Sequence, residues 1–254
     1  MMPQQPAIKA KLEQEILLLQ GFKPLTADPV RAIDIGPIAQ SFPFQQFPTG
    51  GIHEFLISDP SDDACTTAFI AGILAHLMRA GGAVIWITGS KKLFPPAFKQ
   101  FGIEPDRLIL IDLRKEKEAL WVMEEALQYP GLAAVVGELN NIDFTASRRL
   151  QLAVEKSRVT GFILRTVQRR INTIAAVARW QVTSLPSESA DGLPGVSFPR
   201  WKVDLLRVRN GRTGSWTVQW QSGGFRFPQA PALGQLPAVP LPATKLPASN
   251  KKTG

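Results

Sequence analysis

The sequence is built from short apolar runs that alternate with longer segments of helical character. The runs occupy residues 52–57, 83–88, 107–113, 132–137 and 161–165. A strand that is covered on both faces of a parallel sheet reads as a continuous apolar run. Helices are expected between the runs, over residues 68–80, 97–101, 115–128 and 145–157. This alternation predicts an α/β fold, in which a mostly parallel sheet carries helices on both faces.

The pattern changes after residue 165. Residues 179–184 predict a further strand, and residues 201–209 and 215–220 predict the two arms of a hairpin. The connection between the arms, NGRTG, contains the Asn-Gly signal of a tight turn. The sheet is therefore expected to end in antiparallel strands. Residues 228–254 are rich in proline, which predicts a disordered tail.

The chain before the first strand divides into two segments. Within residues 1–23, apolar side chains are spaced so that they form one stripe on a helix. These side chains are Ile8, Leu12, Ile16 and Leu19. Such a helix must bury its stripe on the domain or on a partner. Residues 24–48 contain five prolines and predict an irregular linker that wraps the surface, and residues 49–227 are expected to form the core domain.

The composition restricts the possible classes of function. The chain has 254 residues, a formal net charge of +8, one cysteine and two histidines. One cysteine excludes an intrachain disulfide, and two histidines leave few ligands for zinc, so neither metal nor cofactor is expected. No apolar run approaches the roughly 20 residues that a membrane span needs, and the N-terminus lacks the pattern of a secretory signal. We therefore expect a soluble cytoplasmic protein. The positive charge either favours nucleic acid as a partner or serves solubility alone.

The turn after the first strand has the position of a phosphate-binding loop. Backbone N–H groups at a helix N-terminus that follows a strand can bind phosphate. A working loop also needs glycines, and a lysine just before its hydroxyl residue. Here alanine and cysteine take those places, and carboxylates would repel a triphosphate. The degenerate loop comprises Asp59, Pro60, Asp63, Ala64, Cys65, Thr66 and Thr67.

Isolated polar residues elsewhere give weaker signals. Glu138, at the end of a predicted strand, either holds a metal-bound water, as the acid of an ATPase does, or is an ordinary strand-end carboxylate. His53 and Glu54 are adjacent in a strand and so point to opposite faces, which argues against a joint catalytic role. Cys65 has no evident base, and the acidic turn would raise its pKa. No catalytic residue is predicted.

Arginines form two groups that could contact nucleic acid. One group follows the strand at 161–165, where the ligand loops of open α/β sheets lie. The other lies at the tip of the predicted hairpin. Contacts to a phosphate backbone need such guanidinium clusters, although a solvated sheet face accounts for them equally well. The groups are Arg165, Arg169 and Arg170, and Arg207, Arg209 and Arg212.

The order of these elements resembles the RecA family ATPase core, and their detail resembles its degenerate branch, the ImuA family of error-prone repair accessory proteins. The resemblance covers roughly residues 9–220 and rests on the order and spacing of several segments. These are DPSDDACTT, AVIWITGSKKLFPPAFKQFGIEPDRLILID, ALWVMEEALQYPGLAAVVGEL, IDFTASRRLQLAVE and WKVDLLRVRNGRTGSWTVQW. At the position closest to the catalytic glutamate of the RecA pattern stands Ser90, which cannot act as a base. The acid of the Walker B strand is displaced or replaced, and Gly137 and Glu138 are the candidates for its position.

The resemblance implies a non-catalytic accessory subunit of a DNA-damage-inducible, mutagenic translesion synthesis complex. Its implied partners are an inactive Y-family polymerase subunit of the ImuB type, an error-prone replicative-type polymerase, DNA and, as a further candidate, RecA. Two alternatives remain open at the level of the sequence. One is an inhibitory interaction protein of the damage response like SulA, and the other is a RecA-like ATPase with an unorthodox phosphate loop.

Overall fold

The structure is a computed structural model that describes residues 12, 15–16, 33–90, 93–167, 171–187 and 197–228. Most of the N-terminal helix expected within residues 1–23 lies outside these residues, although Leu12, Glu15 and Ile16 are helical. The expected tail also lies outside them, apart from Pro228. No helix in these ranges is long and apolar enough to cross a membrane.

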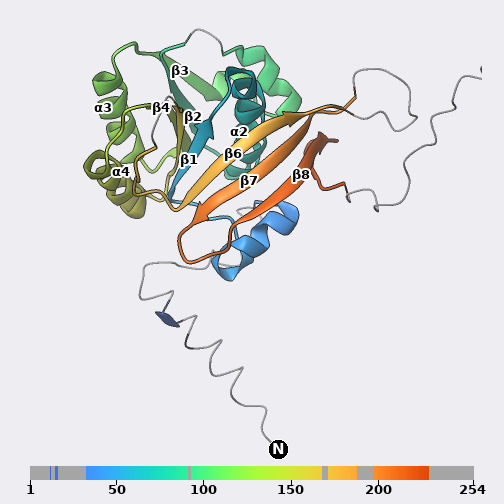
Figure 1. Ribbon diagram of the computed structural model, residues 1–254. Coiled ribbons are helices and arrows are strands. Elements are labelled where there is room, and N and C mark those ends of the chain that lie inside the picture. Colours follow the sequence, from blue (N-terminus) through green and yellow to red (C-terminus); the bar gives the residue numbers. More distant parts are fainter. Residues whose placement is uncertain are drawn as a thin grey trace, which may run out of the picture.

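The described residues form a nine-stranded sheet in the order β3-β2-β4-β5-β1-β6-β7-β8-β9 (Figure 1). β1 (Ile52–Ile57) lies near the middle and pairs in parallel with β5 (Thr160–Thr166) and β6 (Ala178–Leu185). The other parallel strands are β2 (Ala83–Thr88), β3 (Leu108–Asp112) and β4 (Leu132–Glu138). The antiparallel strands are β7 (Arg200–Val208), β8 (Gly214–Gln221) and β9 (Gly224–Arg226). The predicted fold class, mostly parallel with an antiparallel end, is confirmed.

Helices cover the parallel part of the sheet on both faces. α2 (Asp63–Leu77) packs on one face, where Phe69 and Ile70 join a core with Phe55 of β1. α3 (Glu116–Leu127) and α4 (Phe144–Ser157) pack on the other face, where Met123 and Leu150 join a second core. Short 3-10 helices lie between these elements. They are η1 (Gly36–Ser41), η2 (Pro43–Gln45), η3 (Pro60–Asp62), η4 (Met78–Ala80), η5 (Pro95–Phe101) and η6 (Pro105–Arg107).

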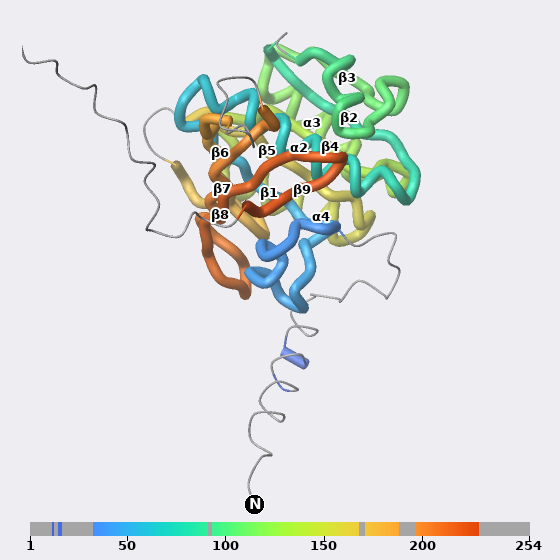
Figure 2. Tube along the Cα trace, turned by 90° about the vertical axis from the view of Figure 1, so that its right-hand side faces the viewer, coloured from blue at the N-terminus to red at the C-terminus, as the bar shows by residue number. Residues whose placement is uncertain are grey.

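Two parts of the chain differ from expectation. Residues 33–48, the described part of the expected surface linker, bury Ile35, Ile38 and Phe47 in the core and so belong to the folded domain. In Figure 2 this blue segment lies beneath β8 and β9. The prediction that residues 107–113 form a buried strand is wrong in its burial. β3 is an edge strand, and Ile109 is 45% exposed.

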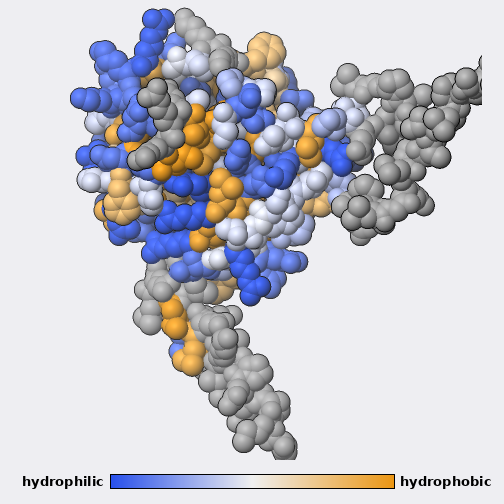
Figure 3. Space-filling view, viewed as in Figure 1, coloured by the Kyte–Doolittle hydropathy of each residue, from blue (hydrophilic) through white to orange (hydrophobic). Residues whose placement is uncertain are grey.

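The antiparallel strands leave one face without a covering helix (Figure 1). Alternate side chains of β6, β7 and β8 point inward, so that Trp180, Val203 and Val218 join the core beneath α2. The opposite face carries polar side chains such as Lys202 and Gln219. Hydrophilic and neutral residues cover most of β6, β7 and β8 in the space-filling view, with hydrophobic patches between them (Figure 3). Leu206 of β7 is one exposed apolar side chain, at 44%. This end of the sheet therefore offers an open and mostly polar surface.

Candidate functional site at the carboxyl ends of the parallel strands

The turn after β1 is closed by the protein's own hydrogen bonds. The Asp59 carboxylate accepts from the Ser61 backbone N–H at 2.8 Å, which caps η3 and lowers the pKa of Asp59. The buried Asp62 carboxylate accepts from the Ser184 N–H at 3.1 Å and so ties the turn to β6. The Asp59 carboxylate thus occupies the Ser61 N–H, and the carbonyls of Asp59 and Pro60 accept from the N–H groups of Asp62 and Asp63, so the turn keeps little N–H capacity for a phosphate group.

α2 begins earlier than expected, and its first turns bury the end of the degenerate loop. Cys65 and Thr66 already lie within the helix and are buried. The Cys65 thiol donates to the Asp62 carbonyl at 3.1 Å, and burial, helped by the charge of Asp62, raises its pKa to about 12. The Thr66 hydroxyl has no hydrogen-bond partner in the described part of the chain. Both side chains are therefore shielded from solvent.

A small polar cavity lies where a nucleotide's phosphates would be expected, beyond the ends of β1, β2, β4 and β5. Its volume is about 300 Å³, and its lining includes the carboxylates of Asp63, Glu116 and Glu138 against the single guanidinium of Arg114. This excess of negative charge opposes triphosphate binding. No group of three or more histidine, cysteine, aspartate or glutamate side chains in the described ranges could hold a metal ion.

Glu138 and Ser90 meet in this cavity. The Glu138 carboxylate accepts from the Ser90 hydroxyl and from the Gly89 backbone N–H, each at 3.3 Å. The two positions that the RecA resemblance assigns to the Walker B acid and to the catalytic base therefore do lie together. A serine hydroxyl is far too weak a base to activate water without a partner that removes its proton. The pair instead joins the loop after β2 to β4.

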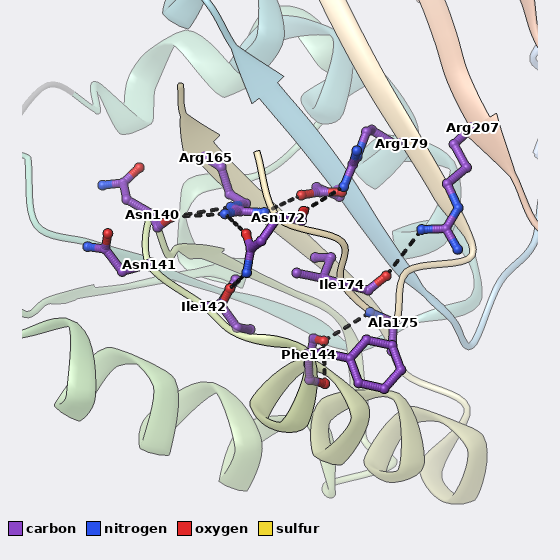
Figure 4. Close-up of polar contacts among 12 residues, drawn as sticks. Asn140, Asn141, Ile142, Phe144, Arg165, Asn172, Ile174, Ala175, Arg179 and Arg207 are labelled. Atoms are coloured by element: carbon purple, nitrogen blue, oxygen red, sulfur yellow. Dashed lines mark hydrogen bonds and ion pairs between the residues drawn. The ribbon is translucent and has the colours of Figure 1, made fainter. Parts of the chain in front are cut away.

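Arg165 is not a surface arginine, so its prediction as a DNA contact is corrected. Its side chain is 7% exposed, and its guanidinium donates to Glu54 at 2.6 Å and to Asn172 and the Asn140 carbonyl (Figure 4). Arg179 donates to the second oxygen of Glu54, also at 2.6 Å. A guanidinium committed to buried partners is withdrawn from solvent and from phosphate. Arg169 and Arg170 lie outside the described residues.

The network around Glu54 holds the segment that crosses from β5 to β6. The side-chain amide of Asn172 accepts from Arg165 and donates to the Ile142 carbonyl at 2.8 Å. The backbone carbonyl of Asn172 accepts from Arg179 at 3.0 Å. The pairing of Glu54, Arg179 and Asn172 with Arg165 is not among the predictions from the sequence. A signal was present in Glu54, because a carboxylate inside a strand buried on both faces needs a cationic partner.

The other three predicted arginines are exposed, and two of them lie at the hairpin tip. Arg207 pairs in register with Arg179, and its guanidinium lies 3.5 Å from the Ile174 carbonyl (Figure 4). The backbone N–H groups of Arg209 and Arg212 donate to the carbonyls of Val177 and Ser41. Since Val177 precedes β6, the tip lies at the amino ends of the parallel strands. Arg209 and Arg212 therefore lie at the opposite end of the sheet from Glu138.

The sheet order, the helices on both faces and the position of the closed turn define a RecA-like α/β protein. The RadB recombinase has a similar fold, with a TM-score of 0.51 at 14% identity, and the match covers 70% of this chain and 91% of that one. No family model matches the sequence.

The sequence comparison is more specific than the fold. Protein ImuA of Caulobacter vibrioides strain NA1000 is 36% identical over an alignment of 211 residues that covers 78% of this chain and 86% of that protein. The chain therefore belongs to the ImuA family. The cell division inhibitor SulA of Photorhabdus laumondii is 27% identical over an alignment of 124 residues that covers 47% of this chain and 70% of SulA.

Proposed function

We propose that this chain is a non-catalytic, RecA-like accessory subunit of a damage-inducible, mutagenic translesion synthesis complex. The observation that carries the proposal is the combination of ImuA family membership with a turn, at the position of the phosphate loop, that is closed by the protein's own hydrogen bonds. The turn after β1 is tied to β6, and the cavity beyond it carries three carboxylates against one guanidinium. A scaffold keeps the fold and needs no hydrolysis.

The proposed complex contains an inactive Y-family polymerase subunit of the ImuB type and an error-prone replicative-type polymerase, with RecA as a further partner. The chain bridges these proteins and DNA. Support for the DNA contact comes from the formal charge of +8 and from the exposed Arg207, Arg209 and Arg212, which extend from β7 to the hairpin tip. A cluster of guanidinium groups suits a phosphate backbone.

Bridging is tested by reconstitution from purified components. The two polymerase subunits are mixed with and without this chain, and the mass of each complex is measured by size exclusion with light scattering. We expect one assembly that contains all three proteins and forms only when the chain is present. Association of the two polymerase subunits to the same extent without the chain would contradict a bridging role.

A second candidate function is inhibition by direct binding to a partner, because the chain is 27% identical to the cell division inhibitor SulA over 124 residues. An overproduction experiment in growing cells distinguishes the two candidate functions. Overproduction of an inhibitor of division produces long undivided cells without any need for the polymerase subunits, whereas overproduction of an accessory subunit leaves cell length unchanged. Microscopy of cells that lack both polymerase subunits distinguishes these outcomes.

A further inference from the structure

A cavity of about 970 Å³ lies at the amino ends of the parallel strands, remote from Glu138. Its wall is formed by residues 43–44 and 46–51, by the turns before β2 and β4, and by α4 from Arg148 onward with the turn into β5. Arg209 reaches it from the hairpin tip. The volume is at the upper end of the range typical of sites that hold small molecules. It is therefore large enough for a nucleotide unit.

Three arginines from separate elements line this cavity. Arg148 lies on α4, Arg158 follows α4, and Arg209 follows β7. The side chains of Arg148 and Arg158 are exposed and make no hydrogen bond or ion pair with any other residue that the structure describes. Glu155 is the single acid in the lining. The guanidinium groups of Arg148, Arg158 and Arg209 outnumber this one carboxylate and give the cavity a net positive charge.

The backbone around the cavity is held in conformations that place these side chains. Arg158 has a φ of 66°, a left-handed conformation that ordinarily favours glycine or asparagine after a helix. Its stem lies against Gly50, where a Cβ would come within 3.3 Å of the arginine Cδ. Phe44, which also lines the cavity, has a φ of 57°. Costly conformations at one site indicate that the surrounding structure fixes Arg158 and Phe44 there.

We infer that this cavity binds single-stranded DNA, with the phosphates on Arg148 and Arg158 and a base against Phe44. Single-strand sites combine a cationic groove with aromatic rings on which bases stack, and the lining supplies both. The exposed Arg212 at the hairpin tip extends the positive charge beyond the cavity. This inference rests on the DNA contact of the proposed function and adds the place where the strand lies.

The test compares the salt dependence of binding to a labelled oligonucleotide. For a single strand, each neutralised phosphate contributes about 0.7 to the slope of log affinity against log salt concentration. The double variant Arg148→Ala/Arg158→Asn should therefore lower the slope by about 1.4. Between 50 and 200 mM salt, the wild type should lose about sevenfold more affinity than this variant. Asparagine is used because it tolerates the left-handed conformation of residue 158.

Arg149→Ala is the matched control. Arg149 lies on the same helix and carries the same charge, but it pairs with Glu124 at 2.8 Å and does not line the cavity. Its loss should leave the salt slope unchanged. Equal salt slopes for the wild type and the double variant would overturn the cavity assignment. This holds even if the double variant binds a polymerase subunit more weakly. Absence of DNA binding by the wild type even at low salt would remove both the cavity assignment and the DNA contact of the proposed function.

Discussion

At the scale of single residues, the carboxylate of Glu54 is the centre of the network that holds the β5–β6 connection. It is 1% exposed and pairs with both Arg165 and Arg179. Removing one partner of a buried ion pair leaves an uncompensated charge, which costs about 3–5 kcal/mol. Glu54→Ala should therefore lower the free energy of unfolding by about that amount, as measured by urea denaturation.

Glu124 provides the control for this measurement, because it pairs with Arg149 on the surface, where the arginine side chain is 55% exposed. Glu124→Ala should cost less than about 1 kcal/mol, since exposed pairs contribute little. Similar losses for Glu54→Ala and Glu124→Ala would contradict the role assigned to the buried network.

His53 lies on the opposite face of β1 and is buried as a neutral side chain. The Trp180 indole N–H donates to Nδ1 at 3.2 Å, and Nε2–H donates to the Pro48 carbonyl at 2.7 Å. Burial lowers the pKa of His53 to about 4. The unfolded chain, with an ordinary pKa near 6.5, binds a proton first as the pH falls. Stability should therefore be full above about pH 6.5 and decrease towards pH 4, by about 3 kcal/mol in all.

The contribution of His53 is isolated by comparison with His53→Gln, which keeps an acceptor for Trp180. Urea unfolding at pH 7 and at pH 4.5 should show a smaller loss of stability for the variant than for the wild type. The same pH dependence in both proteins would place the titrating group elsewhere.

At the scale of elements, burial on both faces made the central strands predictable. Residues 83–88 coincide with β2, and residues 132–137 lie within β4, because their apolar runs match strands covered by helices on each side. β3 has the same composition but lies at the sheet edge, which a local pattern does not reveal. β9 has three residues, too few for alternation to be recognised. The start of α2 was placed too late because acidic turn residues occupy its beginning.

The hairpin tip depends on a close approach to residues 33–48. A Cβ at Gly211 would come 2.2 Å from the Ser41 carbonyl oxygen, and the Arg212 N–H donates to that same oxygen at 2.9 Å. Gly211→Ala should therefore detach the tip, accelerate hydrogen exchange at Arg212 and weaken DNA binding. Gly224→Ala, whose Cβ would meet open space, is the control. Unchanged exchange at Arg212 would show that the tip does not need this contact.

At the scale of the whole molecule, the sequence allowed the fold to be predicted more fully than the site. The position of the degenerate loop followed from its place between a strand and a helix, and Glu138 and Ser90 do meet. Whether each arginine is buried in an ion pair or exposed could not be predicted, because partners such as Glu54 and Arg165 are 111 positions apart in sequence. Nor could the spacing show that Arg148, Arg158 and Arg209 share one cavity, since the fold alone brings α4 and the hairpin tip together.

A RecA-like protein that works without nucleotide should not hydrolyse ATP, and ATP turnover measures this most directly. Purified protein is assayed with Mg²⁺ and ATP, with and without single-stranded DNA, and DNA affinity is measured in parallel. We expect no turnover above the protein-free control and the same affinity with and without ATP. ATP turnover that disappears in Thr66→Val or Glu138→Gln, with the fold intact, would show a working nucleotide site and contradict a non-catalytic role.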